Sequence, residues 1–325
     1  MATREKCALA AALGLMPQLA SSVALDNYVK NFAESVDDEF KMLDDLAKAA
    51  QFQKNCPVKG AVEQDYRNKL IACPSGVELI AGLRFRGLDL QKPFIALLAQ
   101  TEAHLSSDDF TFLKNELPEK FEIFRPRWVR AFISNAHPLG EEVFPIEYAG
   151  KALVGATIEE VAAFSEKASP ISFRETSKNV TLVTAQNTSF YSRYLDAYSV
   201  AHEKFPPSKI WSPVESEVDL AELVKSRTLF EIFVNEQWAG IFGGSFTTLH
   251  GLKGFYIAEI ILAPEMRSKR IASTIQRLAA RTLIRNGATS DDWFYGTIGR
   301  ANTPALKSAL SAGRRVLGTD YWLPI

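Results

Sequence analysis

A basic turn between a buried strand and an amphipathic helix is the stretch of this sequence best suited to chemistry. The apolar run Gly254–Ala263 is rich in β-branched and aromatic residues, which predicts a buried strand. A turn follows at Pro264, and the basic segment Arg267–Ala272 then opens a run with apolar residues at helical spacing, which ends at Asn286-Gly287. The predicted unit is therefore strand, basic turn and helix.

The first turn of a helix has unpaired N–H groups and a partial positive charge, which together suit a phosphate or pyrophosphate. Arg267, Lys269 and Arg270 add full positive charges beside this helix start. The segment therefore suggests an anion site. The alternative is an ordinary connection between a strand and a helix, in which the Arg and Lys side chains are simply solvated.

The composition excludes several classes of protein. At 325 residues the chain is long enough for two domains, and its 37 Lys and Arg nearly balance its 38 Asp and Glu. A net charge so close to zero does not indicate bulk binding to nucleic acid or to an anionic membrane. No apolar run reaches the roughly 18–20 residues that would span a bilayer. We expect neither nucleic acid nor a membrane as a partner.

The cysteines and histidines do not predict a metal centre. Cys7, Cys56 and Cys73 have no CxxC spacing, and the four histidines are scattered. We therefore expect no metal, and reduced thiols in a cytoplasmic protein.

The N-terminus leaves a second possibility for the compartment. Residues 1–24 combine basic residues, a short Ala/Leu run and a Ser-Val-Ala sequence, as a signal peptide does. Glu5 in the charged region, and Gly14 and Pro17 in the weakly apolar core, favour a plain N-terminal helix.

The first part of the chain predicts a mixed set of elements and no recognised motif. They are a helix at Asn31–Phe52, a strand at Val77–Gly87, a helix at Leu90–Leu105, a strand at Phe121–Ser134, a loop at His137–Gly155 and a helix at Thr157–Ala168. We place a domain boundary beside Ser169-Pro170, giving domains 1–170 and 171–325.

The second part has a regular order of strands and helices. The predicted strands are Val180–Ala185, Thr228–Glu236, Gln237–Leu249, Gly254–Ala263, Asp292–Arg300 and a closing strand to Ile325, and the helices are Ser189–Phe205, Ser216–Arg227, Ile271–Gly287 and Asn302–Gly313. Thr303 is the predicted cap of the last helix.

This order, with two short motifs, resembles the GNAT superfamily of acyl-CoA N-acyltransferases. The first motif runs from Leu262 through Pro264 and Arg267 to Ala272, with Arg270 where the family usually has glycine. The second is Asn302 with Ala305, Ala309 and Gly313, where Ala309 replaces an aromatic residue. The resemblance covers about the last 145 residues and leaves the N-terminal domain unrecognised.

The resemblance implies that the chain binds an acyl-CoA, most often acetyl-CoA, as co-substrate. Backbone N–H groups of the turn would hold the pyrophosphate, the strand backbone would pair with the pantetheine arm, and the start of the last helix would bind the cofactor. Carried over to this sequence, these residues are Arg267, Ser268, Lys269, Arg270, Ile271 and Ala272 for the turn, Ile260 and Leu262 for the strand, and Asn302 for the helix.

The resemblance also implies direct attack of an amine on a thioester, which requires a base and benefits from an acid. Glu259 on the central strand is the first candidate base, and His250 is the second. Their alternatives are a carboxylate paired with a surface cation and a solvated loop histidine. Tyr321 could serve as the acid in place of the aromatic missing at Ala309, although a strand aromatic is often part of the core.

The expected fold is α+β (mixed α/β), with a GNAT-like mixed sheet flanked by helices and preceded by a helix-rich domain. That domain could be a degenerate copy of the same fold over residues 77–135. The expected function is N-acetyl transfer from acetyl-CoA to a primary amine of a small molecule or protein, within a ternary complex. The alternative is an inactive CoA-binding or protein-interaction module. The acceptor amine stays open, and so does the choice between monomer and homodimer.

Overall fold

The computed structural model describes residues 2–15, 22–135, 148–164, 179–206, 208–269 and 271–325. These residues form two compact units. Unit 1 comprises Met1–Ala152, Thr248–Leu252 and Leu317–Ile325, and unit 2 comprises Leu153–Thr247 and Lys253–Val316. Both units are therefore assembled from separate stretches of the chain. The predicted boundary at residue 170 lies outside the described residues.

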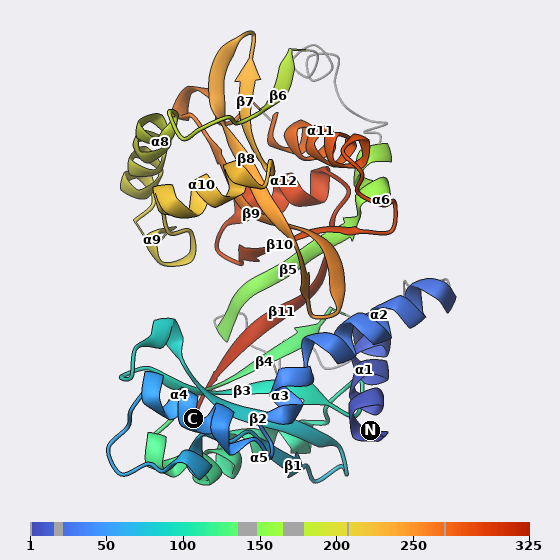
Figure 1. Cartoon of the computed structure of the whole chain (residues 1–325), viewed down its shortest axis with the longest axis vertical. Coiled ribbons are helices and arrows are strands. Elements are labelled where there is room, and N and C mark those ends of the chain that lie inside the picture. Colours follow the sequence, from blue (N-terminus) through green and yellow to red (C-terminus); the bar gives the residue numbers. More distant parts are fainter. Residues whose placement is uncertain (1, 16–21, 136–147, 165–178, 207, 270) are drawn as a thin grey trace. The chain divides into compact units, whose positions relative to one another are not determined.

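Unit 1 begins with four helices and continues with strands (Figure 1). The helices are α1 (Ala2–Leu15), α2 (Ser22–Ser35), α3 (Asp37–Lys41) and α4 (Leu46–Asn55), followed by η1 (Glu63–Tyr66), β1 (Lys69–Ala72), β2 (Glu78–Phe85), η2 (Arg86–Leu88), β3 (Pro93–Gln100), α5 (Ser107–Asn115), η3 (Leu117–Phe124) and β4 (Trp128–Ser134). The strand order is β1-β2-β3-β4-β11, in which β11 (Arg315–Pro324) is antiparallel to β4 and only β3 and β4 are parallel.

The core of unit 1 fills one face of this sheet. Alternate residues of each strand point into it, among them Leu83 of β2, Ile95 of β3 and Val129 of β4, all of them fully buried. Aromatic residues of η1 and η3 complete the core, with the rings of Tyr66 and Phe124 4.9 Å apart in an edge-on arrangement.

Four of the predicted elements in this region are wrong. The strand expected at Phe121–Ser134 begins only at Trp128, since Phe121–Phe124 belong to η3. The apolar run in Leu90–Leu105 is the strand β3 and not a helix, because a short apolar run fits a buried strand as well as a helix. The helix expected at Asn31–Phe52 is interrupted after Lys41, and Asp45 caps the start of α4. The loop expected at His137–Gly155 contains the start of β5 (Ala149–Thr157).

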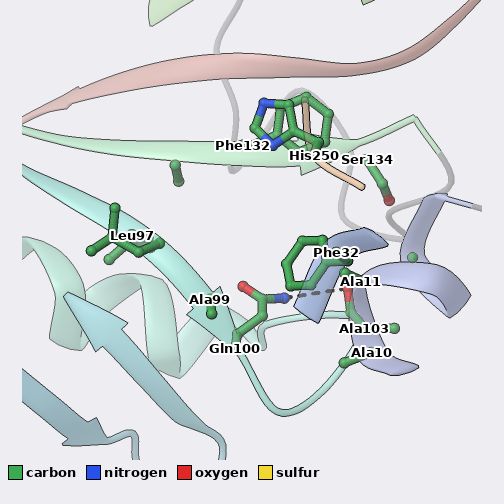
Figure 2. A pocket seen from close by; sticks show the side chains of 13 residues that line it. Ala10, Ala11, Phe32, Leu97, Ala99, Gln100, Ala103, Phe132, Ser134 and His250 are labelled. Carbon is green, nitrogen blue, oxygen red and sulfur yellow. Dashed lines mark hydrogen bonds between the residues drawn. The ribbon is translucent and has the colours of Figure 1, made fainter. Parts of the chain in front are cut away.

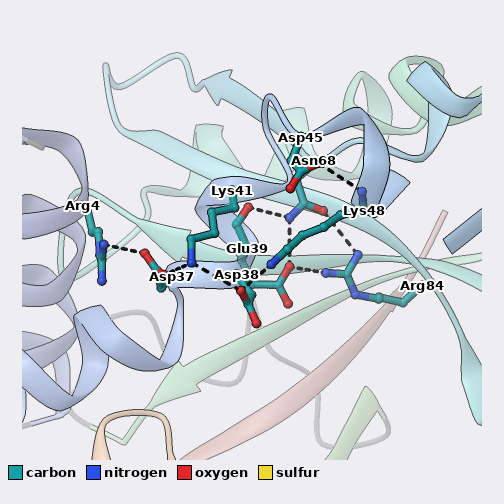
Figure 3. A network of polar contacts seen from close by, with 9 residues as sticks. All are labelled: Arg4, Asp37, Asp38, Glu39, Lys41, Asp45, Lys48, Asn68 and Arg84. Atoms are coloured by element: carbon teal, nitrogen blue, oxygen red, sulfur yellow. Dashed lines mark hydrogen bonds and ion pairs between the residues drawn. The ribbon is translucent and has the colours of Figure 1, made fainter. Parts of the chain in front are cut away.

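Ion pairs and hydrogen bonds connect the N-terminal helices to one another and to the sheet (Figure 3). Asp37 of α3 accepts from Arg4 of α1 at 2.6 Å and from Lys41 at 2.5 Å. Glu39 of α3 pairs with Arg84 of β2. These groups are partly exposed, so each pair contributes little by itself, and the network mainly fixes how α3 lies on β2.

Asp109 fixes the start of α5 from a fully buried position. Its carboxylate accepts hydrogen bonds from the backbone N–H of Ser106 at 2.8 Å and of Ser75 at 3.1 Å, and from both serine hydroxyls at 2.8 Å. Burial alone would raise the pKa of Asp109, but these donors outweigh burial and lower it. The helix start therefore holds an anion supplied by the chain itself.

Unit 2 contains the remaining elements. They are α6 (Ile158–Ala163), β6 (Val180–Thr184), α8 (Tyr191–Lys204), α9 (Ser208–Trp211), α10 (Glu217–Lys225), β7 (Leu229–Val234), β8 (Gln237–Leu249), β9 (Leu252–Leu262), η5 (Pro264–Met266), α11 (Ile271–Arg285), β10 (Trp293–Gly299) and α12 (Thr303–Ser311). The strand order is β5-β10-β9-β8-β7-β6. The predicted cap Thr303 is wrong: Asn302 caps α12, and its side-chain oxygen accepts from Ala305 N–H at 3.2 Å.

Helices cover both faces of the sheet in unit 2 (Figure 1). Ile271, Ile275 and Leu283 of α11 pack with β-strand residues in one apolar cluster, which also includes Val161 of α6. On the other face, the aromatic side of α8 packs with Leu220 of α10. This arrangement is the layered mixed α/β fold that the sequence predicts.

The two units repeat one pattern of strands. In unit 1, the three-stranded run β1-β2-β3 is followed by α5 and by β4, which is parallel to β3. In unit 2, β7-β8-β9 is followed by α11 and by β10, which is parallel to β9. Unit 1 thus has the topology of the degenerate copy considered above, although the elements that form it differ from those expected. Within the described residues, no helix is both long and apolar enough to cross a membrane.

We predict that Asp109→Asn lowers the free energy of unfolding of unit 1 by roughly 2–3 kcal/mol at neutral pH, because several hydrogen bonds to a buried carboxylate are lost or weakened. The folded-state pKa of Asp109 is lowered, so its contribution is present above the unfolded-state pKa of about 4 and disappears as the pH falls. Urea unfolding at pH 7 and at about pH 3.5 measures this contribution. The difference in unfolding free energy between Asp109→Asn and the parent should be smaller at the lower pH.

Asp108→Asn is the matched control, since Asp108 is exposed in the same helical turn. An equal loss of stability in both variants would contradict the assignment to the buried carboxylate.

Candidate functional site: an opening between two parallel strands

The parallel strands β9 and β10 pair only near their start. Three pairs are formed, between residues 254–256 and residues 293–295. β9 continues to Leu262 and β10 to Gly299, and within these described strands no further pair joins them. Residues 260–262 are only half-buried. The carboxyl-terminal half of β9 therefore has a free edge on the side of β10.

A β-bulge accompanies this divergence. A Cβ atom placed on Gly244 of β8 would lie 2.0 Å from the Tyr256 carbonyl oxygen, and one placed on Gly240 would lie 2.1 Å from that of Ile261. Five residues of β8, 240–244, therefore lie opposite six residues of β9, 256–261. In a regular strand, residues three apart point to opposite faces of the sheet. Ile257 and Ile260 nevertheless pack in the same apolar cluster, which agrees with an extra residue in β9. Bulges often occur beside active sites, where they redirect a side chain.

Glu259 is the side chain at the bulge, and it is only 4% exposed. Its carboxylate accepts from the Tyr194 hydroxyl at 2.8 Å and from the Tyr198 hydroxyl at 2.8 and 3.0 Å. Burial raises the pKa of Glu259 to about 7, while these hydrogen bonds and one from Ile260 N–H act in the opposite direction. A carboxylate with a pKa near 7 can accept and return a proton at neutral pH.

One side of α8 carries both tyrosines and also contacts the segment before α10. Tyr194 Oη accepts from Glu215 N–H at 2.8 Å while it donates to Glu259. Tyr198 Oη lies 3.4 Å from Ser212 Oγ, and the Tyr191 hydroxyl donates to the Glu215 carbonyl at 3.3 Å. Residues 212–215 are thus held beside Glu259 by hydroxyl groups.

The turn before α11 is the segment predicted as an anion site. Ser268 has a left-handed backbone with φ of 63°. The first turn of α11 contains no acidic residue, and Lys269 is exposed beside it, with its Nζ 3.6 Å from the sulfur of Met266. Ile271 is buried at the start of the helix. Arg270, one of the predicted residues of this turn, lies outside the described residues.

Arg267 has a different partner from the one its charge suggested. Its Nε donates to the Leu262 carbonyl at 3.0 Å, and its Nη2 donates to the Ala197 carbonyl of α8 at 2.7 Å. The side chain therefore joins the end of β9 to α8. The backbone N–H of Arg267 donates to the Pro264 carbonyl at 3.3 Å, so this donor, Nε and Nη2 are all engaged within the chain.

The backbone of β9 presents donors at its free edge. Ala263 N–H bonds to the Ala239 carbonyl of β8 at 2.9 Å. Successive N–H groups of a strand point to opposite edges, so the N–H groups of Leu262 and Ile260 point away from β8. The Ile260 N–H also bonds to Glu259. Leu262 N–H is therefore the clearer donor for an extended ligand at this edge.

Asn302 and the α11 turn follow the carboxyl ends of β10 and β9. Because parallel strands end at the same edge of a sheet, both helix starts lie at the edge where the strands diverge. The Asn302 side-chain oxygen is used in capping α12. Ala309 is fully buried in α12, so no hydroxyl occupies the position where the resemblance expected an aromatic residue.

The structure does not place His250 and Tyr321 in the unit that contains Glu259. Both belong to unit 1. The His250 ring stacks on Phe132 at 4.2 Å, and burial lowers its pKa to about 4. Tyr321 packs against the core of unit 1. Of the three predicted catalytic residues, only Glu259 lies at the opening between β9 and β10.

Tyr194 and Tyr198 are the site residues whose roles sequence reasoning missed. Their i, i+4 spacing places both hydroxyls on one side of α8, and a carboxylate within an apolar strand must find donors. Together these two observations could have predicted the pairing with Glu259. In the described ranges, no group of three or more His, Cys, Asp or Glu is arranged to hold a metal ion.

From β6 to α12, unit 2 has the order of strands and helices that the sequence predicted from its resemblance, with the short helix α9 added, and the diverging parallel pair lies at its centre. The predicted closing strand is β11, most of which belongs to unit 1. This order of elements is similar to that of the GNAT fold. No family model matches the sequence, and no curated protein matches it.

Solved structures of GNAT proteins are similar over most of the chain. A GCN5-related N-acetyltransferase from Sphaerobacter thermophilus is 11% identical with a TM-score of 0.47, covering 86% of this chain and 84% of that one. A GNAT-family acetyltransferase from Colwellia psychrerythraea is 11% identical with a TM-score of 0.42, covering 76% and 85%. A tandem GNAT protein from the clavulanic acid biosynthesis pathway is 10% identical with a TM-score of 0.42, covering 87% and 96%. With TM-scores below 0.5, these likenesses carry no argument about what this chain does.

We predict that Glu259→Gln becomes more stable relative to the parent as the pH rises. The folded-state pKa of Glu259 is raised, so ionising it costs the parent stability between the unfolded-state pKa of about 4.5 and pH 7. From pH 5 to pH 8, the difference in unfolding free energy should shift by about 2–3 kcal/mol in favour of the variant. Urea unfolding of unit 2 at several pH values measures it. A difference independent of pH would mean that Glu259 titrates normally.

Proposed function

We propose that unit 2 transfers an acyl group, with acetyl-CoA as the donor, to a primary amine by direct attack within a ternary complex. The observation that carries the proposal is the position of Glu259. Its buried carboxylate, with a pKa of about 7, lies at the bulge beside the opening between β9 and β10. Such a group can take a proton from an ammonium ion at neutral pH and so produce the nucleophilic amine.

The residues around the opening fit an acyl-CoA. The first-turn N–H groups of α11 and the charge of Lys269 would bind the pyrophosphate. The free edge of β9 offers backbone groups to the amides of the pantetheine arm, as an added strand would do. Leu262 N–H would donate to the thioester oxygen as negative charge develops there.

The proton balance follows from these positions. Glu259 accepts the proton of the ammonium group, directly or through a water molecule, and the freed nitrogen attacks the thioester carbon. The C–N bond forms, the C–S bond breaks, and the nitrogen then loses a second proton to the leaving sulfur or to water. A thiol has a pKa of about 8.5, so its thiolate leaves without a dedicated acid. This suits a chain that has alanine at position 309.

The second candidate function is a CoA-binding module without catalysis. The buried Ala309 favours it, because the position offers no acid. The two candidates share the binding step and differ in turnover, so binding and catalysis have to be measured separately.

The pH dependence of turnover tests the role of Glu259. With a primary amine that the enzyme accepts, kcat/KM should rise with pH and level off above about pH 7, since protonated Glu259 cannot act as a base. Glu259→Gln should lose roughly 10²–10⁴-fold in kcat/KM while acetyl-CoA affinity, measured by calorimetry, stays within a few-fold of the parent.

In Tyr198→Phe, the rise of kcat/KM should shift to higher pH. The substitution removes a hydrogen bond that stabilises the ionised carboxylate, so the pKa of Glu259 should rise. Tyr191→Phe is the control on the same helix, since the Tyr191 hydroxyl contacts the Glu215 carbonyl and not Glu259. Full activity of Glu259→Gln would contradict the proposal that Glu259 is the base. Tight acetyl-CoA binding without turnover on any amine would favour the binding module.

Charge reversal at Lys269 tests the phosphate site. Lys269→Glu should weaken acetyl-CoA binding about tenfold or more in calorimetry, since about 1.4 kcal/mol of attraction corresponds to tenfold. Acetyl-pantetheine has no phosphate, so its binding should be unaffected by the substitution. Lys253→Glu, exposed near the start of β9, is the matched control. Equal losses with both ligands would mean that the variant perturbs the fold and not a phosphate contact.

A further inference from the structure

Unit 1 contains a cavity of its own, with a volume of about 100 Å³ (Figure 2). Its apolar wall includes Ala10, Ala11 and Gly14 of α1 and Phe32 of α2. Residues 97–100 of β3 and residues 131, 132 and 134 of β4 form the wall on the side of the sheet. The turn between β8 and β9 adds His250. All of these residues belong to unit 1, so the cavity lies within one compact unit.

The cavity lies where β3 and β4 separate. These parallel strands pair only at Ile95 with Val129 and at Ala96 with Arg130. β3 continues to Gln100 and β4 to Ser134, and the residues beyond the paired positions are those that line the cavity. In topology, this is the place in unit 1 that corresponds to the opening between β9 and β10.

The equivalent of the phosphate site is closed in unit 1. The first turn of α5, the helix after β3, contains Asp108 and Asp109, and the buried Asp109 carboxylate already accepts a hydrogen bond from the N–H of the N-cap residue Ser106. A second anion there would meet two negative charges. The first turn of α11 contains no acidic residue. Unit 1 is therefore unsuited to an acyl-CoA, and its cavity requires a different kind of ligand.

The polar atoms of the cavity wall are few and uncharged. Ser134 Oγ is buried without a hydrogen-bond partner in the described part of the chain. The Gln100 amide donates to the Glu102 carbonyl at 2.8 Å and to that of Ala103 at 3.4 Å, which leaves its oxygen as an acceptor. The His250 imidazole is neutral at pH 7, because burial lowers its pKa to about 4.

No lining residue carries a charge at neutral pH, so an ionised ligand would lose hydration without gaining a counter-ion. An uncharged ligand would lose less, and one with a hydrogen-bonding group would satisfy Ser134. A cavity of about 150 Å³ can hold benzene, so the enclosed part of this one suits a group of a few carbon atoms.

We propose that this cavity binds a small uncharged molecule, or the uncharged end of a larger one, with a short branched aliphatic body and an amide or hydroxyl group that hydrogen-bonds to Ser134. This site is separate from the acyl-transfer site, and the proposal does not depend on that function.

Two probes of nearly the same shape test the proposal. Isobutyramide and isobutyrate are titrated separately into the full chain and followed by amide NMR shifts of residues 99, 100, 132 and 134. We expect saturable shifts with isobutyramide and at least tenfold weaker binding of isobutyrate. Equal or tighter binding of isobutyrate would overturn the assignment to uncharged ligands. The absence of saturable shifts with isobutyramide would overturn the site.

Two variants test the place of binding. Ala11→Leu fills the cavity from α1 and should abolish binding of isobutyramide, while Leu9→Ala, on an exposed position of the same helix, should leave it unchanged. Ser134→Ala adds no volume, so it keeps the test valid if Ala11→Leu folds poorly. It should weaken isobutyramide binding about five- to tenfold and leave the free protein at least as stable, since a buried hydroxyl without a partner is removed. Unchanged affinity in Ser134→Ala would overturn the proposed contact.

Discussion

The incomplete pairing of β9 and β10 is the constraint on which unit 2 depends. A strand that has an extra residue cannot keep the same register with both neighbours, and here the bulge lies where pairing with β10 ends. The bulge has two effects. It leaves a free backbone edge on β9, and it turns Glu259 from the α11 side of the sheet to the α8 side. One backbone irregularity thus accounts both for the opening and for the carboxylate beside it.

Burying this carboxylate is costly, and α8 limits the cost. Two tyrosine hydroxyls donate to Glu259, yet they are neutral, so they stabilise its charge without removing it. An arginine in their place would lower the pKa far below neutrality and leave no useful base. Arg267, a cation of the turn after β9, is instead engaged by two carbonyl oxygens. Neutral donors beside a buried acid therefore maintain the pKa near 7.

Local sequence was sufficient to predict much of unit 2. The patterns that predict the strand at Gly254–Ala263, the turn and the following helix lie in contiguous residues. The layered fold follows from the order of such elements. The pairing of Glu259 with Tyr194 joins residues that are 65 positions apart, and local patterns do not record such contacts. His250 was predicted as the second candidate base from its residue type and its place in the loop after a predicted hairpin.

His250 and Glu259 are nine residues apart, and an extended chain of that length separates two side chains widely. His250 accordingly belongs to unit 1 and Glu259 to unit 2. In unit 1, the apolar run that forms β3 has no periodicity to distinguish strand from helix, so its prediction failed. The strand β5 was missed because Gly and Ala in Ala149–Thr157 weaken the strand signal.

Asp109 has a consequence for the choice of buffer. Because the buried Asp109 carboxylate already accepts from Ser106 N–H at the start of α5, a sulfate or phosphate ion would meet a fixed negative charge there. The start of α11 has no internal carboxylate, and an anion that binds only the folded state raises its apparent stability. The two units should therefore respond unequally to a change from chloride to sulfate. Melting temperatures measured in phosphate buffer would then include a contribution from the bound anion that belongs to unit 2 alone.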